Sequence, residues 1–176
     1  MKSIKKVLQS SDYNWTLDEQ HEVIIHTIQE EKDLLVALST SSRKSMVSML
    51  AAILGGRKIF LVIIPLISLL KDWKCQLKSS GTRYSVFWHE IHIFPDSPIV
   101  LANIDLRIKL DLIECIGNSY THERFGGVVI DEVHDVLVSC EFRNYIQFLW
   151  QLQTLLFPVI SISRTLPIHM NAPLIS

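Results

Sequence analysis

The stretch Val128-Val129-Ile130-Asp131-Glu132-Val133-His134 joins three consecutive β-branched residues to two consecutive carboxylates. Apolar side chains on both faces are typical of a strand that is buried on both sides of a parallel sheet. The carboxylates then follow the carboxyl end of the strand, where open α/β sheets bind ligands. One carboxylate there can hold a magnesium ion on a nucleotide, and the second can orient a water molecule. Taken alone, the pair fits an acidic, solvated turn equally well.

Four further apolar runs surround this one, at Leu34–Leu38, Ile59–Ile64, Ile99–Leu101 and Val159–Ile162. Segments with helical spacing of apolar residues lie between and around the runs, over residues 17–28, 44–54, 66–77, 106–116 and 142–156. Loops are predicted at glycine pairs, including Gly126-Gly127. Alternating strands and helices predict an α/β fold of three layers, with a mainly parallel sheet between helices.

The composition narrows the class of protein. The chain has 176 residues, of which 48% are hydrophobic and 20% charged, so it is long enough for about one domain with a sizeable core. A protein that binds nucleic acid mainly through a broad basic face is usually more basic than this chain, whose net charge is -1. Any nucleic-acid contact must therefore be local, or shared with a partner or a missing domain. The three cysteines are too dispersed for a disulfide framework or a cysteine zinc site. We therefore expect a reducing compartment, the nucleus or the cytoplasm.

The longest apolar run, Ile59–Leu70, has 12 residues, whereas a membrane span needs about 20. The basic start of the chain is not followed by the apolar core of a signal peptide. We expect a soluble protein with no membrane partner.

A second polar segment, Ser39 to Ser45, follows the first apolar run and precedes a predicted helix. A strand, a short loop, Lys-Ser and a helix start is the layout of a phosphate-binding loop, because the amino end of a helix attracts anions. Lys44 could reach the terminal phosphates, and the Ser45 hydroxyl could ligate Mg²⁺. The loop has no glycines, so on its own it fits a polar helix start with a serine cap better.

Five segments in order resemble the motifs of RecQ-like DNA helicases, which carry a DExH box and belong to superfamily 2. They are Trp15–Gln20 (glutamine motif), Asp33–Leu38 with Lys44-Ser45-Met46 (motif I), Ile63–Trp73 (motif Ia), Val129–His134 (DExH box) and Ser161–Pro167 (motif III). The resemblance is to domains of fungal type. It implies a RecA-like domain of the P-loop NTPase class over residues 15–176, after an extension over residues 1–14. This would be the first of two motor lobes, with the second absent.

The resemblance also implies ATP and Mg²⁺ as cofactors. Gln20 would read the adenine, and the phosphates would be surrounded by Thr40, Ser41, Ser42, Arg43, Lys44 and Ser45. Asp131 and Ser45 would hold the magnesium ion, while Glu132 would position the attacking water and Lys44 would complete the catalytic set.

Two further groups of residues have roles that the resemblance implies. Nucleotide state would be coupled to domain motion by His134, Ser163 and Thr165. Single-stranded DNA would lie along Pro65, Leu66, Ser68 and Lys71. Lys71, Lys74 and Lys78 share one helix face and could add phosphate contacts, but a solvated helix face explains this spacing better.

The chain departs from the family in three places. The family has Thr-Gly-x-Gly-Lys-Ser where this chain has Thr40 to Ser45 without glycine, and Arg164 replaces the alanine of motif III. Glycine lets the backbone take positive φ and approach phosphate closely. Losing two hydrogen bonds of about 1.5–3 kcal/mol each would weaken ATP binding by about a hundredfold or more. The third departure is the absence of a second lobe. In the family this lobe supplies an arginine finger, which can contribute 10³–10⁵ in rate.

These observations lead to two hypotheses. The first is the ATP- and nucleic-acid-binding domain of an ATP-dependent 3′–5′ DNA helicase, weakly active or inactive without a second lobe. The second is a helicase remnant without turnover that acts as a binding or interaction domain. A metal protein built on His89 and His92 is a weaker third possibility, because no further ligand accompanies this pair.

Overall fold

The computed structural model describes residues 33–37, 49, 58–87, 95–103, 106–117, 124–134, 147–148, 151–152 and 157–163. Within these ranges the strands are β1 (Leu34–Ala37), β2 (Ile59–Ile64), β3 (Tyr84–Val86), β4 (Ile99–Asn103), β5 (Phe125–Ile130) and β6 (Val159–Ser163). The helices whose bounds lie within these ranges are α4 (Ile67–Ser79) and α5 (Leu106–Gly117). All five apolar runs of the sequence are therefore strands.

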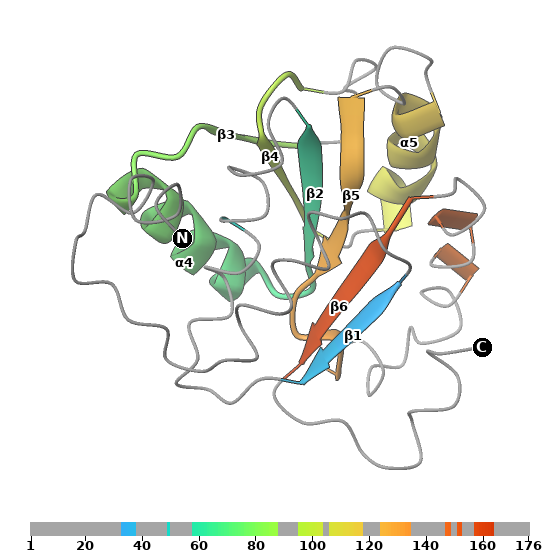
Figure 1. Ribbon diagram of the computed structural model, residues 1–176, viewed down its shortest axis with the longest axis horizontal. Helices are drawn as coiled ribbons and strands as arrows, with labels where there is room; N and C mark the ends of the chain where they lie inside the picture. Colours follow the sequence, from blue (N-terminus) through green and yellow to red (C-terminus); the bar gives the residue numbers. More distant parts are fainter. Residues whose placement is uncertain are drawn as a thin grey trace, which may run out of the picture.

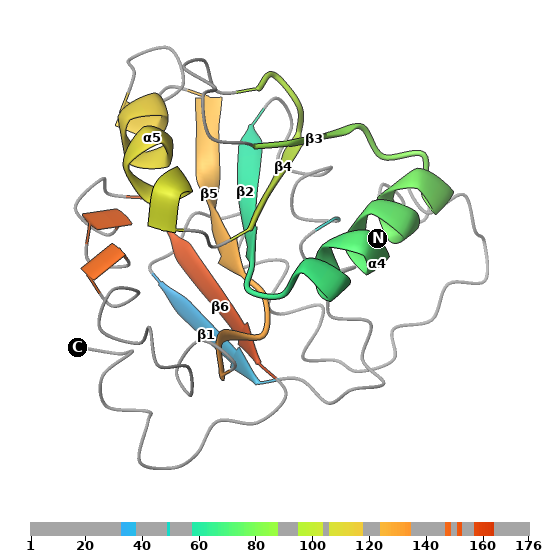
Figure 2. The same cartoon turned by 180° about the vertical axis from the view of Figure 1, so that it is seen from behind.

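The strands form one sheet in the order β1-β6-β5-β2-β4-β3, and every pairing is parallel. Figures 1 and 2 show α4 on one face of this sheet and α5 on the other. The three-layer α/β architecture with a parallel sheet is thus confirmed. No helix among the described residues has the length and hydropathy of a membrane span.

The sheet separates two apolar clusters because successive side chains of a strand point to opposite faces. Ile59, Leu61 and Ile63 of β2 pack in the cluster that includes Leu112 and Ile116 of α5. The alternate residues of β2 pack in the cluster that includes Leu70, Trp73 and Leu77 of α4. All six residues of β2 are buried, which explains why this strand reads as a continuous apolar run.

Sequence reasoning missed β3, and the reason is its position. The strand has three half-buried residues and lies at the sheet edge, where it pairs with β4 alone. A short strand with one covered side needs neither a long apolar run nor a regular alternation.

The loop predicted at Gly126-Gly127 is wrong, because both glycines lie inside β5. A Cβ atom at Gly126 would stand 2.8 Å from a ring carbon of Phe60. Gly127 has a φ of 149°, and a Cβ there would meet the Pro158 carbonyl oxygen at 2.9 Å. The glycines therefore allow close approach within the sheet.

Candidate functional site

Asp131 and Glu132 follow β5 directly, at the carboxyl edge of the sheet. The Asp131 backbone N–H donates a hydrogen bond of 3.0 Å to the Ile63 carbonyl oxygen, so the β2–β5 pairing continues to this residue. The two side chains are buried, with 8% and 5% of their residue surface exposed. The expected pair of carboxylates is thus held at the strand end in a shielded position, which differs from the solvated turn that was the alternative.

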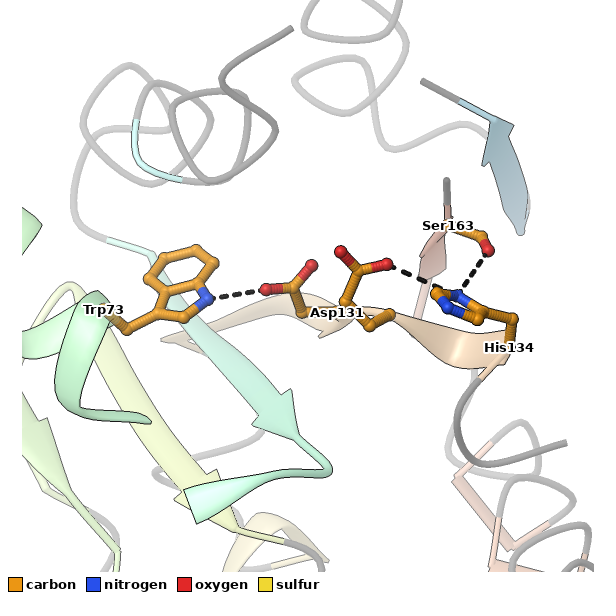
Figure 3. Close-up of polar contacts among 5 residues, drawn as sticks. Trp73, Asp131, His134 and Ser163 are labelled. Atoms are coloured by element: carbon orange, nitrogen blue, oxygen red, sulfur yellow. Dashed lines mark hydrogen bonds and ion pairs between the residues drawn. The ribbon is translucent and has the colours of Figure 1, made fainter. Parts of the chain in front are cut away.

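The Asp131 carboxylate is bonded to a helix on one face of the sheet. The Trp73 indole Nε1–H donates a buried hydrogen bond of 2.7 Å to Asp131 Oδ2 (Figure 3). Trp73 lies on α4, two turns after the end of β2, and is itself buried. The sequence indicated only a core position for this tryptophan. The signal that could have found the bond is general: a buried indole N–H usually has a hydrogen-bond partner.

Glu132 has a φ of 49°, the left-handed conformation, and no other described non-glycine residue has positive φ. This conformation costs roughly 1–2 kcal/mol for a residue with a Cβ. Strained backbone of this kind occurs preferentially at functional sites. The turn separates the two carboxylates, and Glu132 Oε2 lies 3.3 Å from His134 Nδ1.

His134 and Ser163 are in contact at the ends of two neighbouring strands. Ser163, the last residue of β6, is fully buried, and its Oγ lies 2.9 Å from His134 Nδ1 (Figure 3). His134 Nδ1 thus lies within reach of both the Ser163 hydroxyl and the Glu132 carboxylate. The structure therefore brings together residues from the DExH segment and from the motif III segment.

A shared nucleotide-magnesium site formed by Lys44-Ser45 and Asp131-Glu132 suggests that the loop after β1 and the carboxylates after β5 converge from neighbouring strand tips. This expectation of neighbouring strands is wrong. β6 lies between β1 and β5 and pairs with both. Since strands are spaced by about 4.8 Å, the two tips are roughly 10 Å apart. All three strands are parallel, so their carboxyl ends still share one edge of the sheet.

The candidate nucleic-acid residues lie at the turn from β2 into α4. Leu66 and Ser68 are exposed, Lys71 is exposed one turn later, and Pro65 is half-buried. Ile67, which was not singled out, is 68% exposed.

Asn103, which the sequence analysis did not single out, stabilises this turn. Asn103, the last residue of β4, donates from Nδ2 to the carbonyl oxygens of Ile64 at 3.1 Å and Pro65 at 3.5 Å.

Several predicted residues lie outside the described residues: Gln20, Thr40, Ser41, Ser42, Arg43, Lys44, Ser45, His89, His92, Arg164 and Thr165. Among the described residues, no group of three or more histidine, cysteine, aspartate or glutamate side chains could hold a metal. The hard oxygens at Asp131 and Glu132 suit a magnesium ion that takes most of its ligands from phosphates and water.

Comparison with known proteins agrees with this geometry. The family model described as DEAD/DEAH box helicase matches residues 18–172. No curated protein shows significant sequence similarity to the chain.

Two similar solved structures illustrate the fold. The Sulfolobus solfataricus SWI2/SNF2 ATPase core in complex with dsDNA has a TM-score of 0.61 at 17% identity, over 90% of this chain and 32% of that one. A hypothetical ATP-dependent RNA helicase from Sulfolobus tokodaii has a TM-score of 0.66 at 17% identity, over 99% of this chain and 55% of that one. The chain thus spans about a third to a half of these proteins. Because the family model matches most of its length, the chain belongs to the DEAD/DEAH box helicase family.

Proposed function

We propose that this chain is the ATP- and nucleic-acid-binding lobe of a RecQ-like DNA helicase that moves 3′ to 5′. The observation that carries the proposal is the buried Asp131-Glu132 pair at the carboxyl end of β5, with His134 in contact with Ser163 of β6. Two adjacent buried carboxylates cost folding free energy, because burial penalises charge. A site that binds a cation and activates water gives that arrangement a use.

Each side chain then has a defined task. Asp131 takes part in holding Mg²⁺, with Ser45 as a second ligand, and Glu132 orients the water that attacks the terminal phosphate. Gln20 contacts the adenine, and residues 40–45 surround the phosphates with Lys44 among them. When bound, the magnesium ion neutralises charge that develops on the phosphates.

The contact between His134 and Ser163 supports a role in coupling. It joins the turn after β5 to the end of β6, and Thr165 follows β6 by two residues. A change at the phosphates that moves Glu132 would move His134, and through it the segment after β6.

The nucleic-acid contact that we propose is local, which agrees with the net charge of -1. The first turn of α4 presents Leu66 and Ile67, which can pack against bases or sugars, and Lys71, which can contact a phosphate. Pro65 and Ser68 complete the surface along which a single strand would run.

The chain alone should turn over ATP slowly and should not unwind DNA. Ser41 and Arg43 replace the glycines of the phosphate-binding loop, and a second lobe would supply the arginine finger. These substitutions, together with Arg164, favour the second candidate function, a non-enzymatic binding or interaction domain. For either function, we propose a location in the nucleus or cytoplasm.

Binding of ATP with Mg²⁺ tests the proposal directly. The native chain is compared with the double variant Ser41→Gly, Arg43→Gly, and each of these with its Glu132→Gln derivative. We expect the glycines to tighten binding about a hundredfold, from two regained hydrogen bonds to a charged group. Glu132→Gln should retain binding and lose hydrolysis.

Three outcomes separate the candidates. Hydrolysis by the double variant that Glu132→Gln abolishes supports the helicase lobe. Nucleotide binding that appears only after the two glycines are restored supports the remnant. Failure of the double variant to bind Mg²⁺ and ATP refutes both the nucleotide site and the roles assigned to it.

A further inference from the structure

The bond between Trp73 and Asp131 joins the two regions to which the proposed function assigns different ligands. Trp73 lies on α4, whose first turn is the proposed nucleic-acid contact, and Asp131 is the proposed magnesium ligand. The bond is buried, spans 58 positions of sequence, and has a donor–acceptor distance of 2.7 Å. A hydrogen bond with a charged acceptor, shielded from water, is stronger than a neutral one.

The geometry restricts what the carboxylate can do. The Asp131 main chain is fixed by its own hydrogen bond to Ile63, so the side chain retains mainly its rotation about two torsions. The indole N–H holds Oδ2 toward α4, which turns Oδ1 away from the helix. The tryptophan is 3% exposed and packs in the same cluster as Leu70 and Leu77, so the donor itself cannot easily shift.

We infer that Trp73 is a positioning residue, which orients the Asp131 carboxylate for a divalent cation and thereby ties α4 to the cation site. This inference rests on the proposed function, since it deepens the role given there to Asp131. Leu66 and Ile67 lie six to seven residues before Trp73, at the start of the same helix. It follows that a nucleic-acid strand bound there would alter the cation affinity if it displaced the helix. By reciprocity of binding free energies, the cation would alter nucleic-acid affinity by the same factor.

A Trp73→Phe variant keeps most of the ring volume and removes the N–H donor. Leu77→Val is the matched control. Leu77 is fully buried one turn later on the same helix, so this substitution removes volume from the same cluster and leaves the Trp73–Asp131 bond in place. Both are made in the native chain and in the chain with Ser41→Gly and Arg43→Gly. The readouts are the Mg²⁺ concentration that half-saturates ADP binding and, where ATP is hydrolysed, the Mg²⁺ half-saturation of the rate.

We expect Trp73→Phe to raise the half-saturating Mg²⁺ concentration about tenfold, as loss of one hydrogen bond to a charged group predicts. The maximal rate at saturating Mg²⁺ should change less than twofold, because the carboxylate is misoriented and still present. Leu77→Val should stay within twofold of its parent in both quantities. Equal Mg²⁺ dependence for Trp73→Phe and its parent overturns the inference and leaves the proposed function intact.

A second measurement does not use the Trp73→Phe variant and so does not depend on its folding. The chain has four tryptophans, so ¹⁵N-tryptophan labelling gives four indole N–H signals in the native protein. The Trp73 signal is assigned by elimination with Trp15→Phe, Trp88→Phe and Trp150→Phe. It should exchange slowly with solvent and should shift when Mg²⁺ and ADP bind to the chain with restored glycines.

The outcomes of this measurement are distinct. A Trp73 signal that exchanges like a solvated indole, or that is protected but unmoved when Mg²⁺ and ADP saturate the chain, overturns the inference alone. If the chain with restored glycines binds no Mg²⁺ and ADP, the proposed function fails. The positioning role fails with it, and a protected Trp73 signal then identifies the bond as purely structural.

Discussion

The conformation of Glu132 predicts that a residue central to the proposed chemistry destabilises the fold. Its φ of 49° lies where a Cβ atom crowds the backbone, at a cost of roughly 1–2 kcal/mol. Glycine has no such cost, although its greater freedom in the unfolded chain offsets about 0.5–1 kcal/mol. Glu132→Gly should therefore unfold with a free energy roughly 0.5–1 kcal/mol higher than Glu132→Ala.

The comparison between these two variants isolates the backbone. Both remove the carboxylate and its contact of 3.3 Å with His134, so those changes cancel. Only the Cβ differs. Urea unfolding of both variants, followed by circular dichroism, gives the two free energies from midpoints and slopes.

Equal stability of the two variants, or a more stable Glu132→Ala, would refute the reasoning, because residue 132 would then not be held in the left-handed conformation. A difference in the urea slopes would indicate an altered unfolded state, and the comparison would then be repeated by thermal unfolding. Both variants should lose ATP hydrolysis regardless of their stability.

Three further predictions concern residues around the site. Gly126→Ala should lower the free energy of unfolding by about 1–3 kcal/mol, since its Cβ would stand 2.8 Å from the Phe60 ring, whereas Gly117→Ala meets nothing within 4 Å and should be nearly neutral in the same urea titration. Ser163→Ala removes the 2.9 Å contact with His134, and in the chain with restored glycines it should lower the ATPase rate about tenfold, as a loss of about 1.4 kcal/mol predicts. The ADP affinity should stay within twofold, and an unchanged ATPase rate would contradict the coupling role. Asn103→Ala removes the hydrogen bonds to the Ile64 and Pro65 carbonyls, so it should cost about 1 kcal/mol of stability and weaken single-stranded DNA binding in a fluorescence anisotropy titration. The control Ser85→Ala, which removes the contact with Ser97, should leave DNA binding unchanged.

Parts of the fold that depend on long apolar runs were predictable from the sequence. β2 and the second half of β5, Val128–Ile130, are buried on both faces of the sheet, as their continuous apolar runs predicted. The same holds for α4, whose buried residues Leu70, Trp73 and Leu77 recur at helical spacing. The position of Asp131 and Glu132 at a strand end followed from the same pattern.

Features that depend on pairing between distant segments were not predictable. The insertion of β6 between β1 and β5 is a choice among strand orders that leaves the apolar pattern of each strand unchanged. The hydrogen-bond partners of Asp131, His134 and the turn at Pro65 come from residues 29 to 58 positions away. A glycine pair that predicts a loop also fits a strand that another backbone approaches closely, as at Gly127.

The energetics of the site bear on which of the two candidate functions is correct. The two apolar clusters on the faces of the sheet stabilise the described strands. In contrast, the buried carboxylates of Asp131 and Glu132 and the left-handed conformation of Glu132 destabilise the fold. In a domain that only had to fold and bind a partner elsewhere, Asn or Gly at these positions would be more stable. The retained Asp-Glu pair, with Trp73 and Ser163 bonded around it, therefore weighs toward a site that still binds a cation and nucleotide, with the altered loop lowering its affinity.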